Sequence, residues 1–179
     1  NTNKMKKKVK IIYSNYYYNE LIKDMMIVAE KELNSLQIGF DFIGVPGSFE
    51  IPFAIAKSIR EDTTGNQNTL LSSFKTKGKK DIRDNIVQMA KLSQLNLSNQ
   101  CLYSGYLALG CIIKGKTINH EAISTAIFSN LQRISIENNI PIGNGIFNAN
   151  NLEEAIEKYT SCTSQAIKVL HKFIIEKEK

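Results

Sequence analysis

The sequence predicts an α/β fold, a three-layer sandwich in which helices cover both faces of a central, mostly parallel sheet. Short apolar runs rich in β-branched residues alternate along the chain with longer segments whose apolar residues recur at helical spacing. One of these runs, LALGCII, is continuously apolar, which is typical of a strand buried on both faces. This alternation favours right-handed strand–helix–strand crossovers and therefore a parallel sheet. A polar insert interrupts it once.

The first predicted strand and helix follow a basic tail, residues 1–8. The first ten residues of the chain contain five lysines and no acid. The run VKIIYSN, which begins at Val9, is apolar and β-branched and predicts a buried strand. The segment NELIKDMMIVAEKELNSL places apolar residues on one helical face. We therefore expect an amphipathic helix with Asn19 as its N-cap.

A second strand and helix come next. GFDFIGV, residues 39–45, predicts the strand, and PGS ends it. FEIPFAIAKSIR predicts a helix from about Phe49. Pro52 then falls in the first turn, where its missing N–H costs little.

The polar insert spans about residues 61–102. EDTTGNQNTLLSSFKTKGKKDIRD is rich in Gly, Ser, Thr, Asn and Lys and has no sustained period. We expect an exposed, partly disordered segment in which DNIVQMAKLSQLNL, residues 84–97, can form a helix. Apart from this insert, residues 9–179 are expected to form a single domain, which a chain of 179 residues with 42% hydrophobic content can support.

The strand–helix pattern returns after the insert. YSGYLALGCIIKG predicts a strand, HEAISTAIFSNLQRISIENN a helix and IPIGNGIF a further strand. NLEEAIEKY and TSQAIKVLHKFIIEK predict one or two closing helices.

Charge and composition argue against several classes of function. The net charge of +6 is concentrated in the tail and the insert, so no basic face of the kind that binds nucleic acid is expected. The three cysteines form no CxxC pair, which predicts neither a metal site nor a disulfide framework and favours a cytoplasmic setting. No apolar run is long enough to span a membrane, and no signal-peptide pattern is present.

Three loops follow predicted strands, at the sheet edge where open parallel sheets bind ligands. YSNYYYN offers aromatic rings to a planar ligand or simply covers the sheet edge. VPGSFEIP places Ser48 and Glu50 where they can bind substrate hydroxyls and carbonyls or merely cap a helix. GKT, residues 115–117, suits a phosphate or is an ordinary helix cap, and its glycine spacing is not that of a Walker loop.

Taken together, the motifs resemble those of 6,7-dimethyl-8-ribityllumazine synthases, enzymes of riboflavin biosynthesis. The resemblance rests on VPGSFEIPFA, LALGCIIKGKT and IPIGNGIF followed by LEEAIEK, and it covers residues 9–60 and 107–179. It implies a transferase that condenses 5-amino-6-(D-ribitylamino)uracil with 3,4-dihydroxy-2-butanone 4-phosphate and releases phosphate, without metal or organic cofactor. It also implies a homo-oligomer of five subunits or a multiple of five, with small-molecule substrates bound between neighbouring subunits.

The resemblance also implies substrate-binding roles, residue by residue. For the pyrimidine and its ribityl chain, the stacking aromatic residue matches Tyr18, the segment that holds the chain matches Ser48, Phe49 and Glu50, and the strand end that binds the ring edge matches Cys111, Ile112 and Ile113. For the phosphate, the binding turn matches Lys116 and Thr117 and the further cation matches Lys158. The residue that a neighbouring subunit contributes matches Asn144.

The catalytic position departs from the family pattern, which reads Gly-x-Thr-x-His followed by an aromatic and an acidic residue. Here Asn119 stands in the place of the proton-transferring histidine and His120 in the place of the aromatic residue. One step along a helix turns a side chain by about 100°. Both Asn119 and His120 are therefore candidates for the catalytic role.

The irregular catalytic position leaves an alternative function open. The chain can be a weakened homologue that binds ribityl-pyrimidines or flavins or serves in assembly. Lysine at 158, in place of the family's arginine, also favours this alternative, because a bidentate phosphate clamp becomes a point charge. An active enzyme is compatible with these departures, because holding two reactants in position can by itself lower the activation barrier by about 7–11 kcal/mol.

Overall fold

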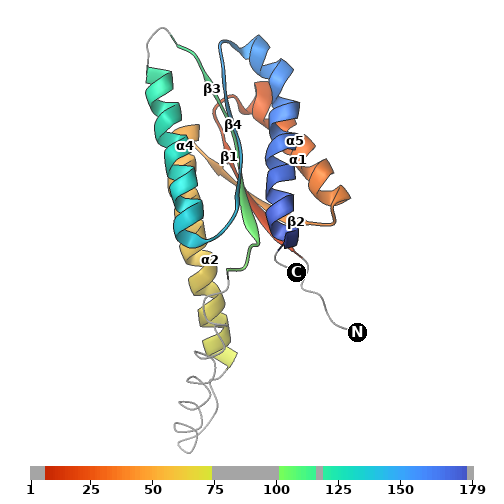
Figure 1. Ribbon diagram of the computed structural model, residues 1–179, viewed down its shortest axis with the longest axis vertical. Coiled ribbons are helices and arrows are strands. Elements are labelled where there is room, and N and C mark those ends of the chain that lie inside the picture. The colour runs from red at the N-terminus through yellow and green to blue at the C-terminus, as the bar shows by residue number, and fades with distance from the viewer. Residues whose placement is uncertain (1–6, 74–100, 116–118, 177–179) are drawn as a thin grey trace, which may run out of the picture. The chain divides into compact units, whose positions relative to one another are not determined.

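The structure is a computed structural model that describes residues 7–73, 101–115 and 119–176 (Figure 1). The chain divides into two compact units, residues 1–56 with 103–179, and residues 57–102. The helix expected at residues 84–97 lies outside the described residues. The sheet, the helices α1, α4 and α5, the first residues of α2 and the candidate site belong to the first unit.

The sheet confirms the predicted fold class. Four parallel strands lie in the order β2-β1-β3-β4, and they are β1 (Lys8–Ser14), β2 (Gly39–Val45), β3 (Gly105–Ile113) and β4 (Ile142–Ala149). β1 pairs with β2 from Lys8↔Gly39 to Ser14↔Val45, so these two strands end together. The strand that follows the insert, β3, is buried along nearly its whole length, as its continuously apolar sequence predicted.

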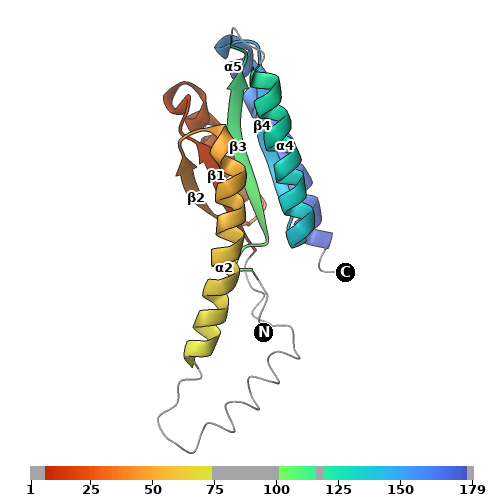
Figure 2. The ribbon, with the colours of Figure 1, turned by 90° about the vertical axis from the view of Figure 1, so that its left-hand side faces the viewer.

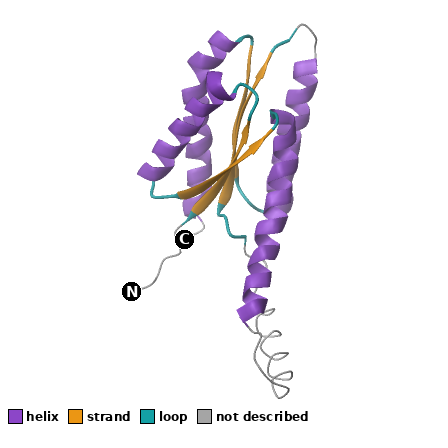
Figure 3. Ribbon diagram, turned by 180° about the vertical axis from the view of Figure 1, so that it is seen from behind, coloured by secondary structure: helices purple, strands orange, loops and turns teal. Residues whose placement is uncertain are grey.

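Helices cover both faces of the sheet. They are α1 (Lys23–Ser35), α2 (Ile51–Ser73), α4 (Asn119–Asn138) and α5 (Leu152–Glu176). α1 and α5 pack together on one face, and α4 and the first turns of α2 lie on the other (Figures 1 and 3). Figure 2 views the sheet from the side of α2 and α4.

The main core lies between the sheet and the pair α1 and α5. Ile11 of β1, Leu107 and Leu109 of β3, Met25 of α1 and Leu170 of α5 are all buried there. A fully buried side chain of this size stabilises the fold by about 1.5–3 kcal/mol. The apolar faces of the two helices and the apolar strands therefore hold the layers together.

The start of the first helical segment differs from the sequence expectation. Asn19 does not cap it, because the segment begins with a π-helical turn, Tyr18–Ile22, that runs directly into α1. Tyr17 precedes this turn with φ of 59°, in the left-handed region, and its carbonyl accepts bonds from the N–H groups of Leu21 and Ile22, both at 3.0 Å. The backbone turn at Tyr17, and not a side-chain cap, begins the helical segment.

Two other helices also differ from or refine the expectation. α2 continues through the first part of the segment expected to be irregular and reaches Ser73. No proline and only one glycine follow Phe53 in this helix, so nothing breaks it, and the Thr63 hydroxyl bonds back to the Ile59 carbonyl at 2.7 Å. At the C-terminal end, α5 is one continuous helix, because no glycine or proline interrupts it.

Candidate functional site

The strand order places a crevice between β1 and β3. From β1 the chain passes to β2 on one side, and β3 and β4 lie on the other side. In open parallel sheets, ligands bind at such a reversal of strand order, outside the carboxyl ends of the strands. The loops after β1, β2 and β3 all end at this edge of the sheet.

The end of β3 extends beyond β1 at this crevice. The pairing of β1 with β3 ends at Tyr13↔Leu109, whereas β3 continues to Ile113 and stays paired with β4 as far as Ile113↔Ala149. Within the described register, the last four residues of β3 therefore have a strand partner on one side only. Their backbone N–H and C=O groups that face β1 can bind the polar edge of a planar ligand.

Ser48 and Gly110 meet at the same place. Ser48 begins the 3-10 turn Ser48–Glu50 between β2 and α2, is 9% exposed, and its Oγ has no hydrogen-bond partner among the described residues. A Cβ at Gly110 would lie 2.5 Å from this Oγ, so only glycine lets the hydroxyl approach the strand so closely. Leaving a buried hydroxyl unpaired costs about 1–3 kcal/mol, so this group is poised to bind a ligand.

Phe49 and Glu50 lie on the exposed side of the same turn. The ring of Phe49 is 62% exposed. The N–H of Glu50 donates to the Gly47 carbonyl at 3.2 Å, and its carboxylate lies 3.1 Å from the point that a Cβ at Gly47 would occupy. Gly47 therefore leaves room for the Glu50 carboxylate, an acceptor for substrate hydroxyls, beside the buried Ser48.

The tyrosines after β1 have different surroundings. Tyr18 is half-buried, and its ring lies 6.0 Å from that of Tyr13 and packs against the core. Tyr17 also packs against the core, and its ring lies 4.6 Å from that of Tyr16. Burial, then Tyr16 and Cys111, raise the pKa of the Tyr17 hydroxyl. Tyr17, one of the three tyrosines that the sequence analysis offered to a planar ligand, is therefore a second aromatic candidate beside Tyr18. Its signal is the left-handed backbone at residue 17, which is not readable from three consecutive tyrosines.

Cys111, Ile112 and Ile113 form the end of β3. Cys111 and Ile112 are buried and Ile113 is half-buried. Burial raises the pKa of the Cys111 thiol to about 12, with Cys162 and Glu154 adding to the effect. The thiol is therefore protonated at neutral pH and is a poor nucleophile. This segment can bind a ligand through its backbone, and not through a thiolate.

The start of α4 carries the two catalytic candidates. α4 begins at Asn119, which is exposed. The His120 side chain is 14% exposed, and its Nε2 lies 3.8 Å from a carboxylate oxygen of Glu121. Lys116 and Thr117, which the sequence analysis assigned to the phosphate turn, lie outside the described residues.

Lys158 lies on the exposed face of α5 and is ion-paired with Glu154, one turn earlier. Glu154 also accepts bonds from the backbone N–H and side-chain amide of Asn150, at 2.8 and 2.7 Å. The Lys158 ammonium, followed by the Asn150 groups, lowers the pKa of Glu154 to about 2, and Glu154 in turn raises the pKa of Lys158. Glu154 therefore competes with any phosphate for the Lys158 ammonium.

Asn144 does not lie with the other candidates in the single chain. It pairs in register with Ala108, four residues before the Ile112↔Asn148 pair at the end of β4. At about 3.3 Å per residue, this separates it from the strand ends by about 13 Å. Its side chain is exposed, and its Oδ1 accepts the N–H of Ile146 at 3.0 Å.

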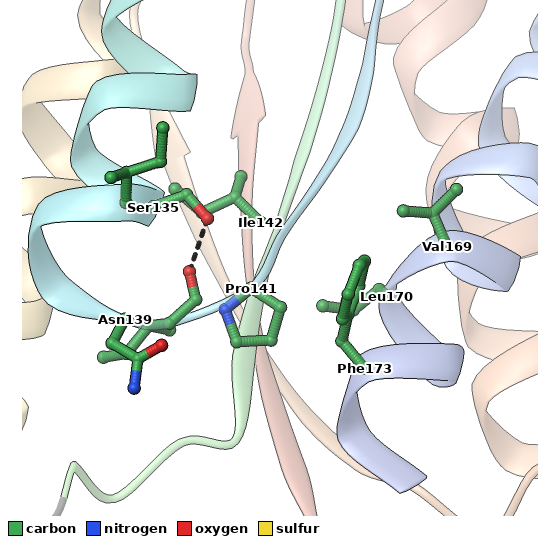
Figure 4. Close-up of a pocket in the computed structure, with 9 residues that line it drawn as sticks. Ser135, Asn139, Pro141, Ile142, Val169, Leu170 and Phe173 are labelled. Carbon is green, nitrogen blue, oxygen red and sulfur yellow. Dashed lines mark hydrogen bonds between the residues drawn. The ribbon is translucent and has the colours of Figure 1, made fainter. Parts of the chain in front are cut away.

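A separate cavity of about 460 Å³ lies where α4 passes into β4, beside α5 (Figure 4). Its lining is mostly apolar and includes Pro141, Val169 and Phe173. The Ser135 hydroxyl in this cavity already donates to the Ile140 carbonyl at 2.7 Å. The cavity therefore lacks the convergent polar groups of the crevice at the other end of the strands.

The described ranges also bear on other classes of site. No helix there has the length and hydropathy needed to cross a membrane. No group of three or more His, Cys, Asp and Glu side chains in the same ranges is arranged to hold a metal ion.

The fold defines a parallel α/β protein with an open crevice at the carboxyl ends of its central strands, the place where such sheets bind ligands. A family model described as 6,7-dimethyl-8-ribityllumazine synthase matches residues 78–173. The chain is 34% identical over 158 residues to the 6,7-dimethyl-8-ribityllumazine synthase of Buchnera aphidicola subsp. Baizongia pistaciae, covering 87% of this chain and 75% of that protein. It is 28% identical to the enzyme of the same description from Afipia carboxidovorans, covering 83% and 70%. The chain therefore belongs to the 6,7-dimethyl-8-ribityllumazine synthase family, as its motifs predicted.

Proposed function

We propose that the protein condenses 5-amino-6-(D-ribitylamino)uracil with 3,4-dihydroxy-2-butanone 4-phosphate to give 6,7-dimethyl-8-ribityllumazine and phosphate. The observation that carries the proposal is the buried, unpartnered Ser48 hydroxyl on Gly110, beside the open edge of β3. A polyhydroxylated chain attached to a planar, polar ring suits this combination. In this proposal the ring forms hydrogen bonds with the open backbone edge of β3, and the ribityl hydroxyls form hydrogen bonds with Ser48 and the Glu50 carboxylate.

The aromatic contact to the ring comes from Tyr17 in this proposal. Tyr17 and Tyr18 both pack against the core, but the ring of Tyr17 lies 4.6 Å from that of the exposed Tyr16, whereas the ring of Tyr18 lies 6.0 Å from that of Tyr13. A ring stacked on the pyrimidine holds the amine in a fixed orientation toward the second substrate. Such positioning of two reactants is worth about 7–11 kcal/mol.

The phosphate of the second substrate binds near the start of α4. Lys116, Thr117 and the N-terminus of that helix supply donors and partial positive charge. Lys158 supplies a further cation, which it shares with Glu154. Carbon–nitrogen bond formation at the substrate carbonyl and loss of phosphate then require proton transfers, for which His120 is the titratable candidate and Asn119 is not.

Assembly into a homo-oligomer, a pentamer or a multiple of five, completes the site in this proposal. The distance of Asn144 from the strand ends supports it, because this residue reaches a site only from a neighbouring copy. A groove of about 410 Å³ between α4 and the start of α2, lined in part by Phe49 and Phe53, also supports it. Phe53 is 73% exposed, and exposed apolar surface of this kind marks an interaction site.

A weakened, ligand-binding homologue is the second candidate function. Two observations favour it, asparagine at position 119 and the engagement of Lys158 with Glu154. It predicts tight binding of ribityl-pyrimidines without product formation. It shares the crevice with the first candidate and differs only in the chemistry at the start of α4.

Turnover with both substrates distinguishes the two functions. We would measure lumazine absorbance with the wild type, His120→Ala and Asn119→His, with oligomeric state measured by sedimentation. An active wild type that loses about tenfold or more in His120→Ala identifies His120 as the proton-transfer group. A nearly inactive wild type that Asn119→His revives identifies a weakened homologue. A wild type that binds neither substrate contradicts both.

A further inference from the structure

A hydrogen-bonded contact outside the predicted site joins the end of β4 to the start of α4. The Ser124 Oγ, on a side chain that is 4% exposed, lies 2.6 Å from the His120 carbonyl oxygen and 2.8 Å from Oδ1 of Asn148. Asn148 pairs in register with Ile112, so it lies at the ligand-binding end of the sheet. Ser124 lies one turn after His120 in α4.

The Ser124 hydroxyl cannot donate to both acceptors around it as they stand. A serine hydroxyl has one proton, and both the His120 carbonyl and Oδ1 of Asn148 are acceptors. The oxygen and nitrogen of a side-chain amide have nearly the same shape, so a half-turn of the Asn148 amide exchanges them. Asn148 then donates to Ser124, and Ser124 donates to the His120 carbonyl. In this direction each group in the chain has a suitable partner.

We propose that Asn148, acting through Ser124, is a positioning residue that holds the first turn of α4, and with it His120 and Asn119, against the end of β4. The two bonds run in one direction, and bonds in such a chain strengthen one another. The His120 carbonyl also faces the backbone N–H of Ser124 within α4, so the hydroxyl supplies a second bond that ties this turn to the end of β4. The direction of the His120 and Asn119 side chains then depends on where this turn is held. The catalytic part of this inference rests on the proposed function.

The first experiment tests the contact without reference to activity. Hydrogen–deuterium exchange would be followed in a peptide covering residues 119–127 in the wild type, Ser124→Ala, Asn148→Ala and the double variant. We expect each single change to speed exchange by about three- to tenfold, the worth of one net hydrogen bond. The double variant should exchange no faster than the faster single variant, because both changes break the same chain. Ser129→Ala, an exposed serine on the same helix, is the matched control.

The direction of the chain is tested by Asn148→Asp. A carboxylate only accepts, so it draws the Ser124 proton away from the His120 carbonyl. We expect exchange at least as fast as in Asn148→Ala. Wild-type exchange in Asn148→Asp, additive effects in the double variant, or single variants equal to Ser129→Ala would each overturn the proposal.

The second experiment tests positioning through kcat, KM and the pH profile of kcat. We expect Ser124→Ala to lower kcat by about three- to tenfold and to change KM by less than about twofold, as for one net hydrogen bond. In a His120→Ala background the same change should have no further effect on kcat, and the pH profiles of His120→Ala with and without Ser124→Ala should coincide. A loss that persists in that background overturns the role of His120. If the wild type makes no lumazine, the proposed function and the catalytic part fail together, while the exchange experiment still decides whether the contact exists.

Discussion

The Ser48 hydroxyl lies 2.5 Å from the point that a Cβ on Gly110 would occupy, although the two residues are separated by the whole insert. Ser48 belongs to the turn after β2 and Gly110 to the part of β3 that extends beyond β1. The hydroxyl is buried and unpartnered among the described residues. The protein thus keeps a destabilising polar group where a ligand can satisfy it.

Replacing the Ser48 hydroxyl should raise the stability of the protein and weaken its binding of substrate. In Ser48→Ala the unpaired group is removed, so we expect the free energy of unfolding to rise by about 1–3 kcal/mol. Affinity for 5-amino-6-(D-ribitylamino)uracil should fall at the same time. Urea unfolding and titration calorimetry measure the two effects. Gly110→Ala should lower both the free energy of unfolding and the affinity, because its methyl group collides with Ser48. Gly39→Ala, whose Cβ meets only ordinary contacts, is the control.

The two tyrosines should differ in the same binding assay. Tyr17→Ala should weaken binding of the pyrimidine by about 1–3 kcal/mol, the range measured for base–aromatic stacking. Tyr17→Phe should retain the binding, because it retains the ring. Tyr18→Ala should chiefly lower stability, because its ring packs against Tyr13 and the core. A larger loss of binding in Tyr18→Ala than in Tyr17→Ala would return the stacking role to Tyr18.

Glu154 should restrain phosphate binding by Lys158. In Glu154→Gln the ion pair is lost, so we expect the affinity for inorganic phosphate to rise by at most about fivefold, as is usual for an exposed pair. Glu153→Gln removes the same charge one residue away and is the control. The pKa of Glu154 is lowered to about 2, so the pair stays ionised at neutral pH and separates only as the pH falls toward that value. Equal affinities in the two variants would exclude the competition.

Asp41 should make stability depend on acid pH. Lys8 lies 2.5 Å from its carboxylate and, together with the Tyr103 hydroxyl, lowers its pKa. A lowered carboxyl pKa contributes stability that is present above the unfolded value of about 3.9 and is lost as the pH falls through the folded value. Asp41→Asn should therefore be less stable than the wild type at pH 7, and the difference should shrink below about pH 4. Asp24→Asn, exposed on α1, is the control in urea unfolding at both pH values.

Local patterns predicted most of the fold. The strands and the helices after β1 and β3 were readable because burial in a parallel sheet and on one helical face leaves a periodic signal. The continuation of α2 beyond Glu61 was not readable, because its polar sequence carries no apolar period, and only the absence of breakers favours a helix there. The start of the first helical segment at Tyr17 was not predicted for a related reason, since a left-handed backbone at one of three consecutive tyrosines has no sequence pattern.

The sequence by itself determined the α/β class, the order of the elements and the family, because these depend on motifs and periods within short segments. The roles of all the predicted site residues, catalytic and substrate-binding, stay predictions. Tertiary structure alone brought Ser48 onto Gly110, left the end of β3 open on one side, and joined Asn148 to Ser124. Each of these contacts joins segments far apart in the chain, and their distance is set by strand register and helix packing, which no local pattern encodes.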